Sequence, residues 1–177
     1  GDYVESDAAN PILLYGKQKA EIEEYLQDHV ADSLILRIAN VYGSDPAGSG
    51  VMAGWFRTVS EGAETVKCAR DYTASPVHVD DVAEAVIRLM EEGRQGIYNV
   101  AGPQPLSRLE MFETLLEEMR RAGPVTVKVE PCSINDFPTE EKRPRDVSLK
   151  LDKLVAATGL EMRTLRSACC DLVAAAS

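Results

Sequence analysis

The chain has 177 residues, 45% of them apolar, which is enough to build the core of one ordinary domain. Nineteen lysines and arginines against 29 aspartates and glutamates give a net charge of -10, the wrong sign for nonspecific binding to nucleic-acid phosphates. Its apolar runs are shorter than the roughly 18 residues that cross a bilayer, and its acidic N-terminus is unlike a signal peptide. We therefore expect a cytoplasmic protein without nucleic-acid or membrane partners.

The first predicted helix runs from Pro11 to about His29, with Asn10 as its N-cap and apolar residues at helical spacing. After it, residues 33–43 (SLILRIANVYG) are apolar on both alternating faces. This pattern is typical of a strand inside a parallel sheet that is covered on each side. We expect one continuous strand that ends at Gly43.

The rest of the chain alternates short helices and strands. After a short helix at 52–61, we expect extended pieces within 65–79, a helix at 82–92, a strand at 96–103 and two final helices at 149–158 and 165–175. Asp80 or Asp81 would cap the helix at 82–92. Ser107 and Glu110 fit a capping box, and the buried stripe of the helix that follows is predicted to be Met111, Phe112, Leu115, Leu116 and Met119. This order indicates an α/β or α+β fold without a complete doubly wound sheet.

The cysteines do not suggest a metal site. They are Cys68, Cys132, Cys169 and Cys170. None of them forms a Cys-x-x-Cys pair, and only His29 and His78 could join them as ligands, so we predict no zinc site. Cys169 and Cys170 are adjacent in a predicted helix, where we interpret them as buried thiols and not as a redox switch.

Tyr15 and Lys19 lie four positions apart in the first predicted helix, so both side chains face the same way. A phenol is a poor acid-base group at neutral pH unless a nearby positive charge stabilises its phenolate, and Lys19 could supply that charge. The spacing also occurs by chance on surface helices. A surface helix and a proton-transfer pair are both compatible with these residues alone.

A glycine-rich segment, GSGVMA at residues 48–53, matches the G-x-G-x-x-A form of the dinucleotide-binding fingerprint, and Asp71 follows about 20 residues later. The fingerprint needs its first glycine directly after a strand, but Gly48 lies five positions beyond Gly43. No βαβ pattern follows it. We interpret the segment as a flexible loop.

Two segments near the N-terminus form a wider pattern: NPILLYGKQKAEIE at 10–23 and LRIANVYG at 36–43. Together they resemble the extended short-chain dehydrogenase/reductase superfamily. Three further segments are DYTASPVHVDDVAEAV, GIYNVAGPQPLSRLEM and RPRDVSL. They are similar to the substrate-binding half of the dTDP-4-dehydrorhamnose reductases and of a related family, the beta subunits of methionine adenosyltransferase.

This resemblance implies a partial Rossmann-type, NAD(P)-binding α/β fold. Residues 1–43 would supply the last helix and strand of the parallel sheet, and residues 44–177 a mixed α/β substrate-binding region. Tyr15 would be the general acid, and Lys19 would hold the nicotinamide ribose of NADP or NAD.

Backbone near Ala39 would lie beside the nicotinamide, and Asn40 and Arg143 would contact a nucleotide-sugar substrate. Asn40 could instead bond its own backbone at a strand end. Arg143 belongs to a basic cluster with Lys142 and Arg145, which suits diphosphates. The alternative is a solvated loop in which these arginines pair with Glu140 and Glu141.

Other residues in these segments are given structural roles. Lys17 is outside the motif, and we expect it to face solvent. We interpret His78, just before a predicted helix, as a packing or capping residue and not a catalytic one. Trp55, Arg57 and Arg70 are weaker candidates for lining the sugar site.

The chain departs from the superfamily because no glycine-rich strand–turn–helix precedes Tyr15. The serine or threonine expected upstream has no clear match, and Ser6 is not assigned to that role. We expect the second half of a reductase, inactive by itself. The alternative is a regulatory subunit that docks on the catalytic subunit of methionine adenosyltransferase. A homodimer is a further expectation, because an unpartnered strand favours pairing.

Overall fold

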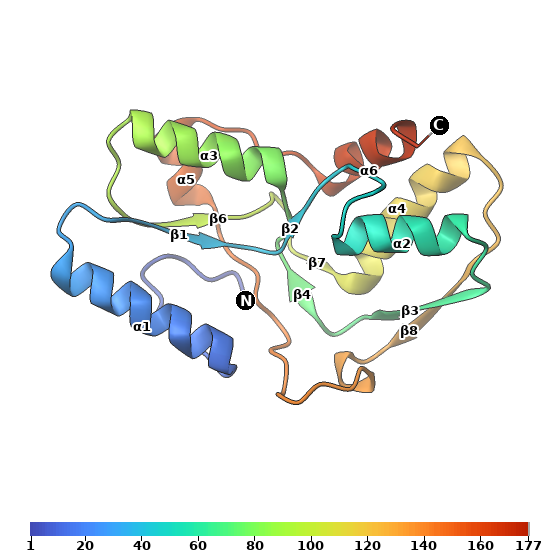
Figure 1. Cartoon of the computed structure of the whole chain (residues 1–177), viewed down its shortest axis with the longest axis horizontal. Helices are drawn as coiled ribbons and strands as arrows, with labels where there is room; N and C mark the ends of the chain where they lie inside the picture. The colour runs from blue at the N-terminus through green and yellow to red at the C-terminus, as the bar shows by residue number, and fades with distance from the viewer. Residues whose placement is uncertain (177) are drawn as a thin grey trace.

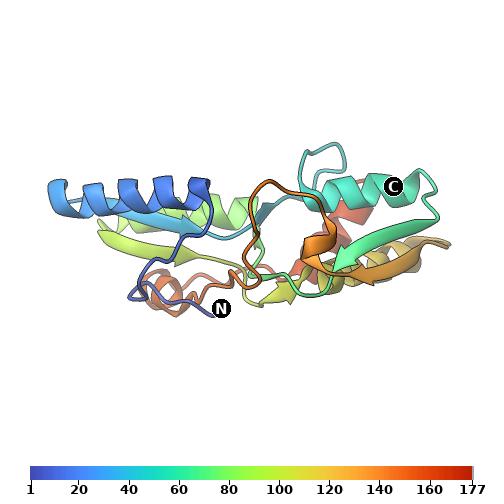
Figure 2. The same ribbon diagram turned by 90° about the horizontal axis from the view of Figure 1, so that it is seen from below.

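The computed structural model describes residues 1–176, which form six α-helices and four two-stranded sheets (Figures 1 and 2). The helices are α1 (Leu14–His29), α2 (Val51–Ser60), α3 (Val79–Glu91), α4 (Arg108–Ala122), α5 (Asp152–Thr158) and α6 (Leu165–Ala174), with a 3-10 turn, η1 (Ile134–Asp136). The strands are β1 (Leu34–Ile38), β2 (Val41–Tyr42), β3 (Thr65–Ala69), β4 (Thr73–Ala74), β5 (Val77–His78), β6 (Gly96–Val100), β7 (Leu106–Ser107) and β8 (Lys128–Cys132).

The strand pairs confirm the α/β class. Three pairs are parallel, β1 with β6, β2 with β5 and β3 with β8, whereas β4 and β7 are antiparallel. Figure 1 shows an elongated molecule with α1, α3, α5, β1 and β6 at one end. At the other end lie α2, α4, α6, β3 and β8.

The continuous strand predicted at residues 33–43 is wrong, because the chain changes partners in its middle. β1 pairs with β6, and β2 pairs with β5. At the joint, the Ala39 N–H donates to the Val100 carbonyl at 2.9 Å, and the Asn40 carbonyl accepts the Val77 N–H at 3.0 Å. The backbone hydrogen bonds of Ala39 and Asn40 are therefore made with two different neighbouring segments, at Val100 and at Val77.

The larger core lies at the end that holds α2, α4 and α6. All five residues of the stripe predicted on α4 are buried in it, which confirms that stripe. The Ser107–Glu110 capping box is also present. The core residues are Tyr42, Met52, Val59, Val66, Cys68, Met111, Phe112, Leu115, Leu116, Met119, Val127, Leu165, Ala168, Cys169 and Leu172. Three helices thus share one closed apolar interior.

The smaller core lies between α3, α5 and the β1–β6 pair, and α1 takes no part in it. Its buried members are Val77, Ala85, Leu89, Tyr98, Val100 and Leu154. α1 has no buried residue, although Leu14, Ile22 and Tyr25 are large apolar side chains. The strand β1 is only partly buried. The sequence predicted that other elements cover both faces of this strand. Within residues 1–176 that cover is incomplete.

Two predicted helix caps are wrong. α1 begins at Leu14, three residues after Pro11, and its N-cap position is Leu13, which forms no side-chain cap. Asn10 precedes a proline, which favours extended backbone and keeps it out of the helix. The cap of α3 is His78 and neither Asp80 nor Asp81.

The glycine-rich segment at 48–53 does not open a dinucleotide-binding unit. Gly50 is the N-cap position of α2, so the segment does lead into a helix. The strands on either side of that helix, β2 and β3, belong to different sheets. A βαβ unit needs both strands in one sheet, so the segment is not a dinucleotide-binding turn. The interpretation of the whole segment as a loop is wrong for residues 51–53, which form the first turn of α2.

The two adjacent cysteines of α6 have different surroundings. Cys169 is buried and Cys170 is exposed, so the prediction that both are buried is wrong for Cys170. Successive helical residues point about 100° apart, so one apolar face rarely takes both. Burial raises the pKa of the Cys169 thiol to about 12. It is therefore a poor nucleophile at neutral pH.

Residues 1–176 contain neither a membrane-spanning helix nor a cluster of metal-ligating side chains. Helices in this range lack the length and apolarity that spanning a membrane requires. The same range contains no group of three or more His, Cys, Asp or Glu side chains placed to hold a metal ion.

Candidate functional site

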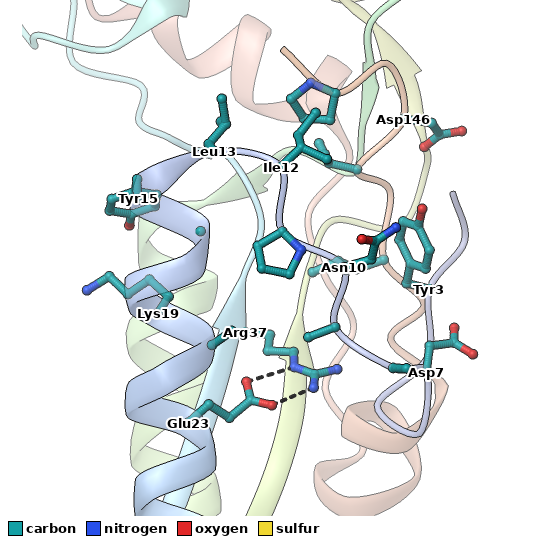
Figure 3. Close-up of a pocket in the computed structure, with 18 of the residues that line it drawn as sticks. Tyr3, Asp7, Asn10, Ile12, Leu13, Tyr15, Lys19, Glu23, Arg37 and Asp146 are labelled. Atoms are coloured by element: carbon teal, nitrogen blue, oxygen red, sulfur yellow. Dashed lines mark hydrogen bonds and ion pairs between the residues drawn. The ribbon is translucent and has the colours of Figure 1, made fainter. Parts of the chain in front are cut away.

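Tyr15 and Lys19 share one exposed face of α1. The Lys19 Nζ atom lies 5.5 Å from the centroid of the Tyr15 ring. Both side chains project from the same side of the helix (Figure 3). Tyr15 is 68% exposed, so a ligand can reach its hydroxyl. The arrangement places an ammonium group beside a phenol that could exchange a proton with a ligand.

A groove of about 630 Å³ lies next to this pair. Its walls are the segment before α1, the α1 face from Tyr15 to Glu23, Arg37 on β1, and residues 144–149. Small-molecule sites commonly occupy roughly 300 to 1,000 Å³. The groove is therefore large enough for part of a cofactor or substrate.

A polar clamp holds α1 beside this groove. The Arg37 guanidinium donates to both carboxylate oxygens of Glu23, at 3.0 and 2.5 Å, and to the Glu5 carbonyl at 3.3 Å. The hydrogen bond to Glu23 raises the pKa of Arg37. Figure 3 shows this pair between α1 and the N-terminal segment. Because no α1 residue is buried, the clamp substitutes for an apolar interface.

The loop that holds Lys142, Arg143 and Arg145, here called the basic loop, contacts the start of α1 through Glu141. The Glu141 carboxylate accepts the N–H of Leu14 at 2.9 Å, one residue before Tyr15. Arg143 is exposed and lines a separate pocket of about 350 Å³ formed by residues 134–143. The structure thus places Arg145, but not Arg143, in the groove beside Tyr15.

The alternative of ion pairs within the basic loop is wrong for the described part of the chain. None of the ion pairs within residues 1–176 joins Lys142, Arg143 or Arg145 to Glu140 or Glu141. Glu141 instead caps α1. The guanidinium of Arg143 is therefore left for solvent or a ligand.

Ala39 and Asn40 lie at the carboxyl ends of β1 and β6, outside the lining of the groove as far as the structure describes it. In open α/β sheets, ligands bind outside the carboxyl ends of parallel strands. The Asn40 side chain does not bond its own backbone. Its Oδ1 atom accepts the hydroxyl of Tyr72 at 3.2 Å.

Tyr72 is held in turn by Arg108. The Arg108 guanidinium lies 5.3 Å from the centre of the Tyr72 ring. The backbone N–H of Arg108 donates to the Tyr72 backbone carbonyl at 3.2 Å. The Arg108 Nη1 atom is buried and lacks a hydrogen-bond partner within residues 1–176. Three polar side chains, those of Asn40, Tyr72 and Arg108, therefore gather at this end of the sheet.

Ser44, His78 and Asp80 have the composition of a hydrolytic triad, but their hydrogen bonds run the wrong way. The Ser44 hydroxyl donates to the Ala168 carbonyl at 3.2 Å, so it must accept from His78 Nε2 at 3.1 Å. His78 Nδ1 accepts the Asp80 backbone N–H at 3.2 Å. A catalytic histidine would instead take the serine proton. The predicted capping role of His78 is confirmed.

Two weaker candidates for the sugar site have structural partners. Trp55 packs against Phe112 in the larger core, with ring centroids 5.2 Å apart. The Arg57 guanidinium donates to the carbonyls of Pro46 and Gly48 at 2.8 and 2.7 Å. Both side chains are thus engaged within the protein.

The sequence did not predict the contacts made by Tyr72, Arg108 and Glu141. Tyr72 meets Asn40 across 32 positions, and Glu141 meets Leu14 across 127 positions. Such contacts leave no periodic or local pattern. The only signal for Glu141 is its place beside the basic cluster.

The chain is similar in sequence to known proteins of two kinds. A probable low-salt glycan biosynthesis reductase of Haloferax volcanii is 28% identical over 179 residues, covering 100% of this chain and 59% of that protein. The beta subunit of methionine adenosyltransferase 2 of Danio rerio is 29% identical over 115 residues, or 62% of this chain and 36% of that protein. This chain thus spans less than two thirds of these relatives.

A solved structure shows the same fold. It is a dTDP-4-dehydrorhamnose reductase of Bacillus anthracis in complex with NADP, with a TM-score of 0.82 and 22% identity. The match covers 94% of this chain and 57% of that one. A family model described as the RmlD substrate binding domain matches residues 1–177. The chain therefore belongs to the RmlD substrate-binding-domain family.

Proposed function

We propose that this chain carries the proton-donating helix and the substrate-binding part of an NAD(P)-dependent reductase that acts on a nucleotide-linked sugar. The exposed pair of Tyr15 and Lys19 is the observation that carries the proposal, because the two side chains share one face of α1 and both residues contribute to the lining of a ligand-sized groove. In this proposal residues 1–43 belong to the Rossmann part, and residues 44–177 bind substrate. The relatives that are reductases by name support the same reaction class.

Tyr15 is the proposed proton donor. Its hydroxyl would hydrogen-bond to the carbonyl oxygen of the sugar and give up its proton as that oxygen becomes an alcohol. The ammonium of Lys19, 5.5 Å from the ring, would stabilise the phenolate that remains. Asn40 and Arg143 would hold the nucleotide sugar, since a guanidinium suits phosphate oxygens.

The residues fit one part of a nicotinamide cofactor. NADP or NAD, when bound, would supply the hydride. The Tyr15 hydroxyl and Lys19 ammonium suit the ribose hydroxyls beside the nicotinamide, with backbone near Ala39 close by. The pyrophosphate normally rests on a glycine-rich turn inside a βαβ unit. Residues 48–53 do not provide that unit, so we expect the 177 residues alone to bind NADPH weakly in a fluorescence titration.

The test is replacement of Tyr15 by Phe in the protein expressed from its complete reading frame. Turnover of a dTDP-linked 4-keto sugar with NADPH should fall by about 100- to 10,000-fold, the usual contribution of a general acid. KM should change little, because the ring remains. Tyr25→Phe is the matched control, since Tyr25 is exposed on the same helix. Equal turnover in Tyr15→Phe and wild type would remove Tyr15 from the mechanism.

A second candidate is a regulatory subunit, favoured by the similarity to the beta subunit of methionine adenosyltransferase 2. In that role the partner would be the adenosyltransferase catalytic subunit. A pull-down with that subunit, combined with the keto-sugar assay, separates the two. Binding without turnover would select the regulatory role.

The proposed compartment is the cytoplasm, because all four cysteines are free thiols, as in reducing compartments. We also propose a homodimer. Its support is the large apolar side chains exposed on α1, such as Leu14 and Ile22. Sedimentation velocity would measure the oligomeric state.

A further inference from the structure

Asn40 is fixed in the structure on its backbone and on one side of its amide. Its carbonyl accepts the Val77 N–H at 3.0 Å at the joint between β1 and β2. Its side-chain Oδ1 accepts the Tyr72 hydroxyl at 3.2 Å. The Nδ2 group makes no hydrogen bond within residues 1–176, although it carries two donors. Asn40 therefore has an unused donor beside the carboxyl end of the parallel pair.

Tyr72 is itself held from two directions. The guanidinium of Arg108 lies 5.3 Å from the centre of the Tyr72 ring, and the backbone N–H of Arg108 donates to the Tyr72 backbone carbonyl. The next residue, Thr73, pairs with Ser107 in the β4–β7 ladder, and its N–H donates to the Arg145 carbonyl at 2.7 Å. The ring and backbone of Tyr72 are thus fixed before any ligand arrives.

The Tyr72 hydroxyl meets the oxygen end of the Asn40 amide. Because the Tyr72 hydroxyl donates to Oδ1, the Asn40 amide must turn its NH₂ group toward the remaining space. A ligand atom that meets this group has to accept a hydrogen bond. Without the hydroxyl the amide can rotate, and its oxygen can then accept a bond from a ligand hydroxyl.

We propose that Tyr72 is a positioning residue that holds the Asn40 amide with its NH₂ group toward the substrate, so that this position presents a hydrogen-bond donor to an acceptor oxygen of the substrate. The proposal rests on the proposed function in one respect, namely that Asn40 contacts the sugar nucleotide. It adds a positioning role for Tyr72 and a supporting role for Arg108.

The experiment is a double-mutant cycle in the protein expressed from its complete reading frame, with Tyr72→Phe, Asn40→Ala and the double variant. The probes are a dTDP-linked 4-keto sugar and the corresponding 4-hydroxy sugar. Tyr72→Phe should weaken binding of the keto sugar by about 3- to 10-fold, the range of one hydrogen bond. Binding of the hydroxy sugar should change less, because a rotated amide can accept from it.

The cycle separates positioning from general support of the fold. If Tyr72 acts through Asn40, Tyr72→Phe has no further effect in the Asn40→Ala background. An equal loss in both backgrounds would overturn the proposal. Arg108→Met, which removes the group packed on the Tyr72 ring, should give a smaller change in the same direction. Thermal unfolding of each variant checks that it folds.

A spectroscopic measurement keeps this proposal separate from the proposed function. In the 177-residue chain labelled with ¹⁵N, the Asn40 side-chain amide should become more mobile in Tyr72→Phe than in wild type. Tyr25→Phe is the control and should leave that signal unchanged. If wild type fails to bind the sugar nucleotides, the proposed function is wrong, and the Asn40 signal still decides whether Tyr72 orients the amide. An unchanged signal in Tyr72→Phe would refute the positioning role.

Discussion

The two ends of the molecule are held together by different forces. α4 buries six of its residues, among them a stripe shared with α2 and α6. α1, at the opposite end in Figure 1, buries none. It is tied down by the Arg37–Glu23 pair and by Glu141. The end with the closed core is stabilised by buried apolar surface, whereas the helix that carries Tyr15 is held by polar contacts.

Removing one large apolar side chain at each end tests this difference most directly. Phe112→Ala in α4 should lower the free energy of unfolding by about 3–5 kcal/mol, because the fully buried ring leaves a cavity. Ile22→Ala in α1 should cost less than about 0.5 kcal/mol, because Ile22 is exposed. Urea unfolding of the 177-residue chain measures both. Similar losses would show that α1 is covered in solution.

The end that holds α4 also contains a buried carboxylate. Glu118 of α4 is buried, and its carboxylate accepts from Arg121 and Arg166, with the Cys170 thiol also donating to it. Burial alone would raise the pKa of Glu118, but these hydrogen bonds outweigh that effect and hold it below the ordinary 4.5. The network joins α4 to α6.

The sign of the pH dependence follows from this lowered pKa. Between the folded and the ordinary pKa, the unfolded chain binds more protons, so stability rises with pH. The contribution of Glu118 is fully present above about pH 4.5 and is lost as the pH falls through the folded value. Glu118→Gln should cost about 1.5–3 kcal/mol at pH 7. It should also reduce the acid limb, meaning the fall in the free energy of unfolding as the pH drops below about 4.5.

A matched control for Glu118 lies on the same helix. Glu117 also pairs with Arg166, but its side chain is 53% exposed. Glu117→Gln should cost less than about 1 kcal/mol and keep the acid limb. Urea unfolding from pH 3 to pH 7 measures both variants. If Glu117→Gln and Glu118→Gln gave the same pH profile, the buried network would not be the source of the acid sensitivity.

Local patterns predicted the well-packed end. The α4 stripe and the Ser107–Glu110 box were readable because each is fixed within a few residues. The pairing of Tyr15 with Lys19 also follows from helical periodicity. The break between β1 and β2 was not readable, since it depends on which distant strands lie alongside. The separation of Arg143 from the groove beside Tyr15 likewise depends on how a long loop folds back.

The smallest expected effect tests the tie between the basic loop and α1. Glu141→Ala should remove the acceptor for the Leu14 N–H and cost about 1 kcal/mol, the usual value of a helix cap, because α1 has no side-chain cap of its own. Glu141→Gln keeps an acceptor oxygen and should behave almost as wild type. Hydrogen exchange at Leu14 should be several-fold faster in Glu141→Ala alone. Equal exchange in all three proteins would mean that the loop does not hold the helix. Because Arg143 lies two residues from Glu141, a confirmed tie would link the position of the loop that carries Arg143 to the order of the turn that carries Tyr15.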